Sequence, residues 1–545
     1  MPDAQSVPHH LQHSLDFHGL AIVDEDRVIW AHQSKHHPRH WPGLARRYNN
    51  AFILLFEGFA AANATIGAAA AVQARREYGI STTLAYVVFT TTTLIGITLA
   101  ASIFPPLSET FGRKKPYVSC SLLLCASHGI TAIPGLPAAV IGRLLAGFTS
   151  GVSFCVSPGA LEDIYDSETM MWGMFAWNTA SNVGLTLGPI ASAYIAQSLG
   201  WRWVFYIAML VSFAIFCMSL TFHESRPNLL LLRRFEKLKA ETGNTTLRAE
   251  NPDSSPTFRY FLQEAAIRPT KLLFTEPIVL ICSFMNGVAF ALIFALTEAL
   301  TIVYSAFGFS DEATSLAFIP VLLGVLLSTV NRFYDQHQMK TLRLEERISD
   351  LPELKVQSFA VSAPALAVGL WLFAWTIPPL VSDVPWIVSM IGLVAVGYAA
   401  NDFDTVLCGY LVDSYTTYAN SALGGLGLLR GLLMVGFASF THPFYTNLGS
   451  NIATTVLAAG ATVFCVCPFI LLRYGRRLRE RSSFARYSTA MAQMNMSGPG
   501  EVLLPVSGDG IGKDRVNAVM VRDDEMVSVV STPVSATRTT ALDQL

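Results

Sequence analysis

Apolar residues along the chain gather into twelve long stretches that are separated by polar segments. A helix needs about 20 apolar residues to cross the ~30 Å hydrocarbon core of a bilayer. Each stretch has roughly this length, so the pattern predicts an all-α membrane protein with twelve transmembrane helices. We place them at 50–71, 83–105, 117–135, 138–160, 172–197, 202–222, 276–304, 313–331, 358–380, 386–411, 420–441 and 452–473.

A long polar segment divides these helices into six before it and six after it. Equal halves around a central loop indicate two six-helix bundles that face one another. We therefore expect a cytosolic tail at each end, two bundles and a cytosolic loop between the bundles. Their ranges are 1–48 (tail), 49–222 (bundle), 223–275 (loop), 276–474 (bundle) and 475–545 (tail).

The composition supports a membrane protein without enzyme chemistry. Charged residues make up 14% of the chain, compared with about 25% in soluble domains. The net charge of −2 does not favour a nucleic-acid partner. The eight cysteines lie in or beside apolar stretches without zinc-site spacing, and no phosphate-binding Gly-x-x-x-x-Gly-Lys-Ser/Thr motif occurs. We expect neither an enzyme nor a cofactor or metal requirement.

The two tails are expected to be disordered. Residues 1–48 are polar, contain eight of the twelve histidines and include no signal peptide. A metal-binding histidine tract is the alternative for this segment. Residues 490–545 are rich in Ser, Thr, Val and Gly.

Arginine and lysine residues indicate the orientation in the membrane. If the N-terminus is cytosolic, the cytosolic loops contain three, nine and five of them (113–115, 223–275 and 332–357). The loops on the other face contain Arg75, Arg76 and Arg202. Because cytosolic loops are enriched in these residues, both termini are predicted to be cytosolic.

The sequence FPPLSETFGRKKPY, residues 104–117, places a dense group of charges between two apolar stretches. Cations in such a turn can act as topology signals alone. Glu109 can also pair with a cation or cap a neighbouring helix, and Gly112 permits a sharp turn. These residues indicate a charge cluster that forms and breaks as a bundle interface opens.

The same residues resemble the loop 2–3 signature of the major facilitator superfamily, in the form found in fungal drug:proton antiporters. Pro105 and Thr110 depart from the signature, and Glu109 replaces its aspartate. The matching residues are Leu107, Ser108, Phe111, Gly112, Arg113 and Lys114.

Further motifs extend this resemblance over most of the chain. Gly142-Arg143-Leu-Leu-Ala-Gly147 is similar to the Arg-x-x-x-Gly motif of the fourth helix. Gly184-Leu-Thr-Leu-Gly188-Pro189 is similar to the antiporter motif of the fifth helix, and Arg430 falls on the Leu-Arg of the eleventh. The resemblance implies a major facilitator fold, a gating role for the loop 2–3 residues and a part for Arg143 in proton coupling.

Six ionisable residues stand out inside the predicted helices, where a charge costs roughly 2.5–3.5 kcal/mol on insertion scales. They are Glu57, Arg143, Glu298, Asp402, Asp404 and Arg430. We assign proton coupling to Glu57, Asp402 and Asp404 together with Arg143. Asp402 and Asp404 point about 200° apart on a helix, so one can face the pathway while the other pairs with Arg430. A structural role for each acid is the alternative.

The predicted function is the export of a small organic compound, such as a drug, toxin, secondary metabolite or polyamine, by proton antiport with alternating access. An uptake carrier or facilitator on the same fold and a non-transporting membrane sensor are the alternatives. The expected partners are the substrate, protons and lipid, for a monomer in the plasma membrane or, alternatively, the vacuolar membrane. The residues predicted to line the substrate cavity are Asn63, Asn178, Asn182, Asn286, Glu298 and Arg430.

Overall fold

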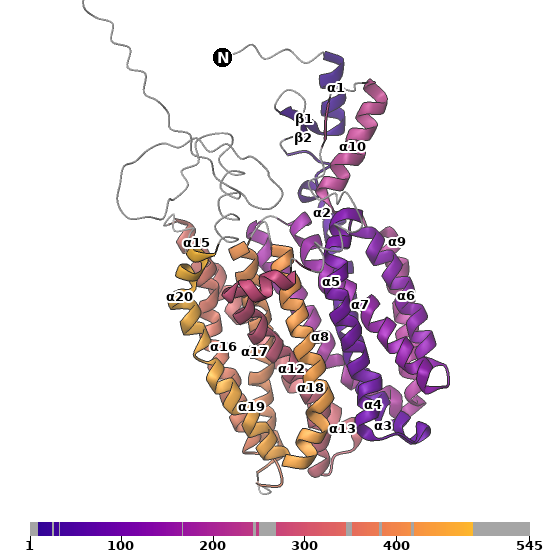
Figure 1. Ribbon diagram of the computed structural model, residues 1–545, viewed down its shortest axis with the longest axis vertical. Helices are drawn as coiled ribbons and strands as arrows, with labels where there is room; N and C mark the ends of the chain where they lie inside the picture. Colours follow the sequence, from indigo (N-terminus) through magenta and orange to yellow (C-terminus); the bar gives the residue numbers. More distant parts are fainter. Residues whose placement is uncertain are drawn as a thin grey trace, which may run out of the picture.

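The N-terminal half of the chain forms one helical bundle and the C-terminal half forms another, side by side (Figure 1). The mostly helical architecture predicted from the sequence is confirmed. The computed structural model describes residues 9–23, 27–31, 33–165, 167–243, 247–249, 267, 269–344, 351–380, 384–415 and 419–482.

Each predicted span of the first half coincides with a helix or with consecutive helical segments. The chain turns between α6 and α7 at the sequence Pro134-Gly135-Leu136-Pro137, where Gly135 has a φ of +128°. The segments are α2 (Gly43–Thr65), α3 (Gly67–Tyr78), α4 (Thr82–Tyr86), the π-helical η2 (Val87–Thr91), α5 (Thr92–Phe111), α6 (Lys114–Ala132), α7 (Leu136–Ile164), α8 (Ser167–Leu199) and α9 (Trp201–Thr221).

The second half follows the predicted spans in the same way. The last helix continues to Arg481, so the predicted boundary at 474 falls inside α20. The segments are α12 (Pro277–Ala306), α13 (Asp311–Ser315), α14 (Phe318–Leu327), α15 (Thr329–Leu344), α16 (Leu351–Ala374), α17 (Trp386–Tyr415), α18 (Ala419–Leu448), α19 (Ser450–Phe464) and α20 (Cys467–Arg481).

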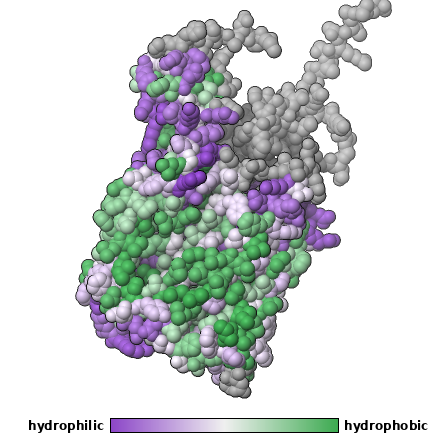
Figure 2. All heavy atoms as spheres, turned by 180° about the vertical axis from the view of Figure 1, so that it is seen from behind, coloured by the Kyte–Doolittle hydropathy of each residue, from purple (hydrophilic) through white to green (hydrophobic). Residues whose placement is uncertain are grey.

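Ten helical spans in the described part of the chain are long and apolar enough to cross a membrane. Helices α6 and α8 are not among them, although α6 packs on α7 and α9 and α8 packs on α2. The count of twelve transmembrane helices therefore stays a prediction. On the face seen in Figure 2 the bundles present a broad hydrophobic surface, with hydrophilic residues towards its ends, as expected for a bilayer-embedded chain.

The two bundles meet through α5 and α18, and through α8 with α14 and α17. One hydrophobic cluster is shared between the halves, with Ala64 and Leu185 from the first and Phe290 and Phe294 from the second. The interface between the bundles is therefore a packed core that can hold a site in the middle of the membrane.

Helix α5 continues through Pro105 and Pro106 to Phe111, whereas the sequence predicted an end at residue 105. The hydroxyl of Ser108 donates to the carbonyl oxygen of Pro105 at 2.8 Å, and that of Thr110 donates to Pro106 at 3.1 Å. These bonds support the last turn of the helix, after the two prolines.

The predicted disorder of residues 1–48 is wrong for the described residues 9–40. They form α1 (His9–His18), an antiparallel pair of strands, β1 (Leu20–Val23) and β2 (Arg27–Trp30), and the short η1 (Pro38–His40). These elements lie against α10 (Pro227–Thr242) of the central loop, at one end of the bundles (Figure 1).

A small hydrophobic core explains this difference. Leu15, Leu20 and Val28 of the tail pack together with Leu231 and Leu238 of α10. Each segment alone has too few apolar residues to suggest a core, and the two segments lie about two hundred residues apart in the sequence. The predicted disorder after residue 490 falls outside the described residues.

Candidate functional site

A cavity lies between the two bundles, with walls from α2, α5, α7 and α8 on one side and α12 and α18 on the other. Its lining is mostly apolar and includes the rings of Phe154, Phe290 and Phe294. Arg430 is the only charged side chain among the described residues that line it. The cavity has a volume of about 60 Å³. It suits a small, largely apolar compound that meets one cation.

Arg430 is held between an acid and two aromatic rings. Its Nη1 atom lies 3.6 Å from Asp404 Oδ1, and its guanidinium carbon lies 4.6 Å from the centre of the Phe290 ring and 5.8 Å from that of Phe154. Asn286 Nδ2 donates to Asp404 Oδ1 at 3.0 Å. The predicted ion pair between one acid of α17 and Arg430 is therefore made by Asp404.

Glu57 lies fully buried on α2, inside the N-terminal bundle. Its Oε2 atom accepts a hydrogen bond from Ser153 Oγ at 2.7 Å. The Trp177 and Ser181 side chains of α8 lie beside the carboxyl group, and Arg430 is close enough to attract it. The immediate neighbours of this acid are neutral polar groups. No ion pair therefore holds Glu57 in its charged form, and it can gain or lose a proton without breaking one.

Arg143, on α7, holds oxygen atoms rather than a carboxylate. Nε donates to the backbone oxygen of Phe89 at 2.7 Å, and Nη1 and Nη2 donate to the side-chain and backbone oxygens of Asn63, both at 2.9 Å. Sequence reasoning missed His128 of α6, whose Nε2 atom lies 3.0 Å from Asn63 Oδ1 and whose Nδ1 atom lies 2.9 Å from Ser212 Oγ. An ionisable residue inside the predicted span 117–135 was the available signal.

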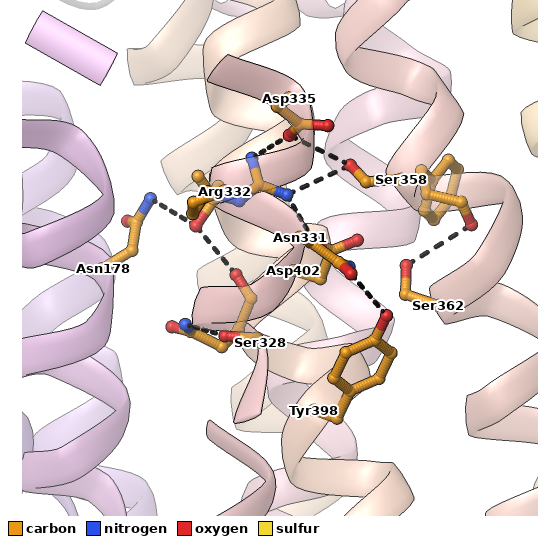
Figure 3. A network of polar contacts seen from close by, with 12 residues as sticks. Asn178, Ser328, Asn331, Arg332, Asp335, Ser358, Ser362, Tyr398 and Asp402 are labelled. Carbon is orange, nitrogen blue, oxygen red and sulfur yellow. Dashed lines mark hydrogen bonds and ion pairs between the residues drawn. The ribbon is translucent and has the colours of Figure 1, made fainter. Parts of the chain in front are cut away.

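Asp402 lies in a second polar network of the C-terminal bundle, which Figure 3 shows together with Asn178 of the N-terminal bundle. Arg332 binds the Asp402 carboxylate and forms a second ion pair with Asp335, with Nη1 and Oδ2 2.8 Å apart. Asn331 Nδ2 donates to Asp402 Oδ1, and Arg332 Nη2 donates to Ser358 Oγ, both at 3.0 Å. Asp402 is thus enclosed by structural partners, away from Arg430.

Arg332 was not predicted as a site residue. It follows directly after the predicted helix at 313–331, where the sequence suggests a cytosolic loop cation. In the structure the helix continues through α15, which places Arg332 in the bundle with 2% of its surface exposed. An available signal was Asp335 three residues later, because this spacing places two side chains on one helix face.

Asparagines of both bundles meet where α8 contacts α14 and α17. Asn182 Nδ2 donates to Asn401 Oδ1 at 3.0 Å, and Asn401 Nδ2 donates to Ser328 Oγ at 2.7 Å. Asn178 Nδ2 donates to Thr405 Oγ1 at 3.4 Å. These bonds join the bundles in the interior of the protein, so they must rearrange when the bundles separate there.

Of the six residues predicted to line the cavity, Arg430 is in its wall. Asn178 and Asn182 join the bundles, Asn63 binds Arg143, and Asn286 binds Asp404. Glu298 is buried farther along α12, close to the backbone of His442 on α18. These five residues do not line this cavity, and their part in substrate binding stays a prediction.

The charged cluster after α5 is built around Arg113. Nε donates to Asp163 Oδ2 at 3.0 Å, and Nη1 donates to Ser108 Oγ at 2.6 Å. Burial acts to lower the pKa of Arg113, but the nearby carboxylates of Asp163 and Glu109 outweigh it and raise that pKa above its ordinary value. The guanidinium therefore stays charged at every physiological pH.

Glu224, which follows α9, caps α6 in the role that the sequence suggested for Glu109. Its carboxylate accepts hydrogen bonds from the backbone nitrogens of Arg113 at 2.8 Å and Lys114 at 3.1 Å. Gly112 has a φ of +89°, and a Cβ atom there would overlap the Glu224 carboxylate. Glycine is thus required both by the backbone conformation and by the close approach. The predicted Leu107 is half-buried beside this cluster.

The glycines of the predicted antiporter motif bring α8 against α2. A Cβ atom at Gly184 would overlap the backbone oxygen of Gly58, and one at Gly188 would overlap Thr65 Oγ1. Small residues permit this close packing of membrane helices. Pro189 follows inside the same helix. Packing therefore accounts for both glycines.

Among the described residues, no group of three or more His, Cys, Asp or Glu side chains is placed to hold a metal ion.

Comparisons with known proteins agree with this architecture. Residues 51–435 match the sequence profile of the Major Facilitator Superfamily. The chain is 27% identical over 458 residues to the efflux pump bik6 of Gibberella fujikuroi, covering 83% of this chain and 94% of that protein. It is 27% identical to the major facilitator superfamily multidrug transporter FLU1 of Candida albicans, over 82% of this chain and 74% of that one. It is 30% identical to the transporter paaT of Penicillium rubens, over 75% and 74%.

Solved structures show the same fold at low sequence identity. The proton:xylose symporter XylE matches with a TM-score of 0.57 and 14% identity, over 80% of this chain and 96% of that one. The human organic anion transporter MFSD10 matches with a TM-score of 0.55 and 16% identity, over 79% and 100%.

Proposed function

The chain belongs to the major facilitator superfamily, and we propose that it exports a small organic compound by proton antiport through the cavity between its bundles. It is an integral membrane protein of the transporter type, and two of its curated relatives are named as an efflux pump and as a multidrug transporter. Export is therefore the favoured direction over uptake.

The observation that best supports proton coupling is the pairing of Asp404 with Arg430 in the cavity wall. A proton on Asp404 cancels its attraction for Arg430, so the cation that faces the substrate is released. Glu57 supplies a second buried carboxyl group close to the same cation. Antiport requires that the proton and the compound disfavour each other's binding. Proton uptake at either acid makes the surroundings of the substrate more positive, which weakens the binding of a cationic compound.

The substrate is proposed to be a small amphipathic compound. The aromatic and apolar lining favours a hydrophobic body. When both acids are ionised, Glu57, Asp404 and Arg430 together carry one formal negative charge. This charge favours a neutral or cationic compound over an anion. A drug, toxin or secondary metabolite fits this description. A polyamine also fits its charge, although it would make fewer contacts with the apolar lining.

We place both termini in the cytosol and the protein in the plasma membrane, as a monomer. The elements α1, α10 and α15 lie at one end of the bundles (Figure 1). The excess of arginine and lysine in the loops at this end supports the orientation.

The test uses purified protein in liposomes with a pH-sensitive dye trapped inside. Rhodamine 6G, spermidine and a neutral azole are added under an imposed proton gradient. We expect one compound to drive proton movement in wild type and in Glu236→Gln, an exposed acid on α10, but not in Asp404→Asn. Equilibration of the compound without proton movement would instead indicate a facilitator. Absence of both fluxes in folded protein would favour the sensor alternative.

A further inference from the structure

Helix α7 presents two different faces. Phe154, Cys155 and Pro158 line the cavity between the bundles. Ser153 and Ser157 are fully buried, one helical turn apart, and bond to groups of the N-terminal bundle. The second face has no part in the cavity described above.

The two serines connect Glu57 to Tyr117 by an unbroken series of polar contacts. Ser153 Oγ donates to Glu57 Oε2 at 2.7 Å, the Ser153 and Ser157 hydroxyls lie 3.5 Å apart, and the Ser157 and Tyr117 hydroxyls lie 2.9 Å apart. All four side chains have no solvent-exposed surface. The series therefore runs through the interior of one bundle, from the middle of α2 to the start of α6.

The ring of Tyr117 is packed among aromatic side chains. Its centre lies 5.3 Å from Phe52, 5.8 Å from Phe56 and 5.3 Å from Phe222. A Cβ atom at Gly159, two residues after Ser157 on α7, would lie 2.5 Å from Arg113 Nη2, so the Arg113 guanidinium lies against the same segment of α7. The series of hydroxyls therefore ends near the charged cluster of Arg113 and Asp163.

We propose that the hydroxyls of Ser153, Ser157 and Tyr117 carry a proton between Glu57 and the charged cluster at Arg113. This inference rests on the proposed proton coupling and adds the path that the proton takes through the N-terminal bundle. A hydroxyl both donates and accepts, so it can pass a proton on without holding a charge for long. In this proposal the substrate contacts the face of α7 that lines the cavity, and the proton moves along the face that holds Ser153 and Ser157.

The proton steps balance without any further reactant. The protonated Glu57 gives its proton to Ser153, which passes its own hydroxyl proton to Ser157, and Ser157 does the same to Tyr117. Tyr117 gives its proton to the Asp163 carboxylate of the charged cluster, which becomes the acid, and each hydroxyl ends with one proton. The titratable or charged groups that act on Glu57 or Tyr117 from the packed elements are Cys155, Arg113 and Arg430.

The test follows the proton directly and needs no transported compound. Full-length protein in lipid nanodiscs is taken through a rapid rise in pH, and the carboxyl infrared band that is absent in Glu57→Gln is followed in time. We expect Tyr117→Phe to slow the loss of this band about tenfold or more, because one link of the proton path is removed. Ser157→Ala should act similarly, and Ser157→Thr should restore the rate.

Tyr445→Phe is the matched control. Tyr445 is buried in the C-terminal bundle and its hydroxyl bonds to Thr454 at 3.1 Å, so this variant should leave the rate unchanged. An unchanged rate in Tyr117→Phe, equal slowing in both tyrosine variants, or a Glu57 band that does not respond to pH would each overturn the proposal. Failure of antiport in liposomes, with the band kinetics as expected, would overturn only the proposed function.

Discussion

Arg113 and Asp163 form an ion pair that fastens the start of α6 to the end of α7, with Nε and Oδ2 3.0 Å apart. Both side chains are buried, with exposed fractions of 2% and 6%. Removing one partner of such a pair costs roughly 3–5 kcal/mol, since the other charge stays behind without compensation. The cluster is therefore an element of stability as well as a proposed gate.

The first prediction concerns this pair. Arg113→Gln should lower the free energy of unfolding by about 3 kcal/mol, measured by thermal unfolding in detergent. Arg226→Gln is the control, because Arg226 lies 3.7 Å from the same carboxylate and is more exposed, at 15%. This variant should cost about 1 kcal/mol or less. Equal losses of stability in the two variants would mean that the burial of Arg113 does not determine its contribution to the free energy of unfolding.

The second prediction separates the two acids of α17. Asp402→Asn should reduce stability by about 2 kcal/mol, because Arg332 and Asn331 lose a charged partner. Asp404→Asn should cost less, because its contact with Arg430 is longer, at 3.6 Å, yet it should stop compound-driven proton movement.

Thermal unfolding and proton flux in liposomes are measured on both variants. A stable Asp402→Asn protein without proton flux, beside an active Asp404→Asn protein, would reverse the assignment.

The helices of this protein could be predicted from the sequence because apolar length alone decides whether a segment can cross a bilayer. The prediction also placed Glu57, Arg143, Asp402 and Asp404 inside the membrane, where the structure has them buried. Their assignment to proton coupling remains a prediction.

The partners of these residues could not be predicted, because a helix pattern does not give the register between helices. From the sequence alone, Arg332 was interpreted as a cation of a cytosolic loop. Ser153 and Ser157 were not distinguished from other small residues of a packed helix. The contact between the N-terminal segment and α10 depends on a few leucines far apart in the chain. Each of these features arises only when distant elements meet.

The third prediction concerns Gly112. Gly112→Ala should destabilise the protein by about 1–3 kcal/mol, because it combines a positive φ with overlap of the Glu224 carboxylate. Gly135→Ala is the control, since its φ of +128° is also unfavourable but nothing lies within 4 Å of the added Cβ atom. We expect a clearly larger fall in the thermal midpoint for Gly112→Ala. Equal falls would show that the backbone conformation alone requires glycine.

The fourth prediction is a pH dependence of the contact between the N-terminal segment and α10. His36 Nδ1 accepts a hydrogen bond from Arg234 Nη2 at 2.9 Å, so His36 must be neutral there. Burial, followed by the charge of Arg234, lowers the pKa of His36 below its ordinary value. The separated segment therefore binds more protons as the pH falls through about 6.5, and the contact is stable above this pH and weakens below it.

Hydrogen exchange of β1, corrected for its intrinsic pH dependence, measures this effect between about pH 7.5 and pH 5.5. We expect faster exchange at the lower pH in wild type and a smaller pH effect in His36→Gln, whose side chain can still accept from Arg234. His13→Gln, at an exposed position of α1, should keep the wild-type response. The same pH response in His36→Gln as in wild type would assign the effect to another group.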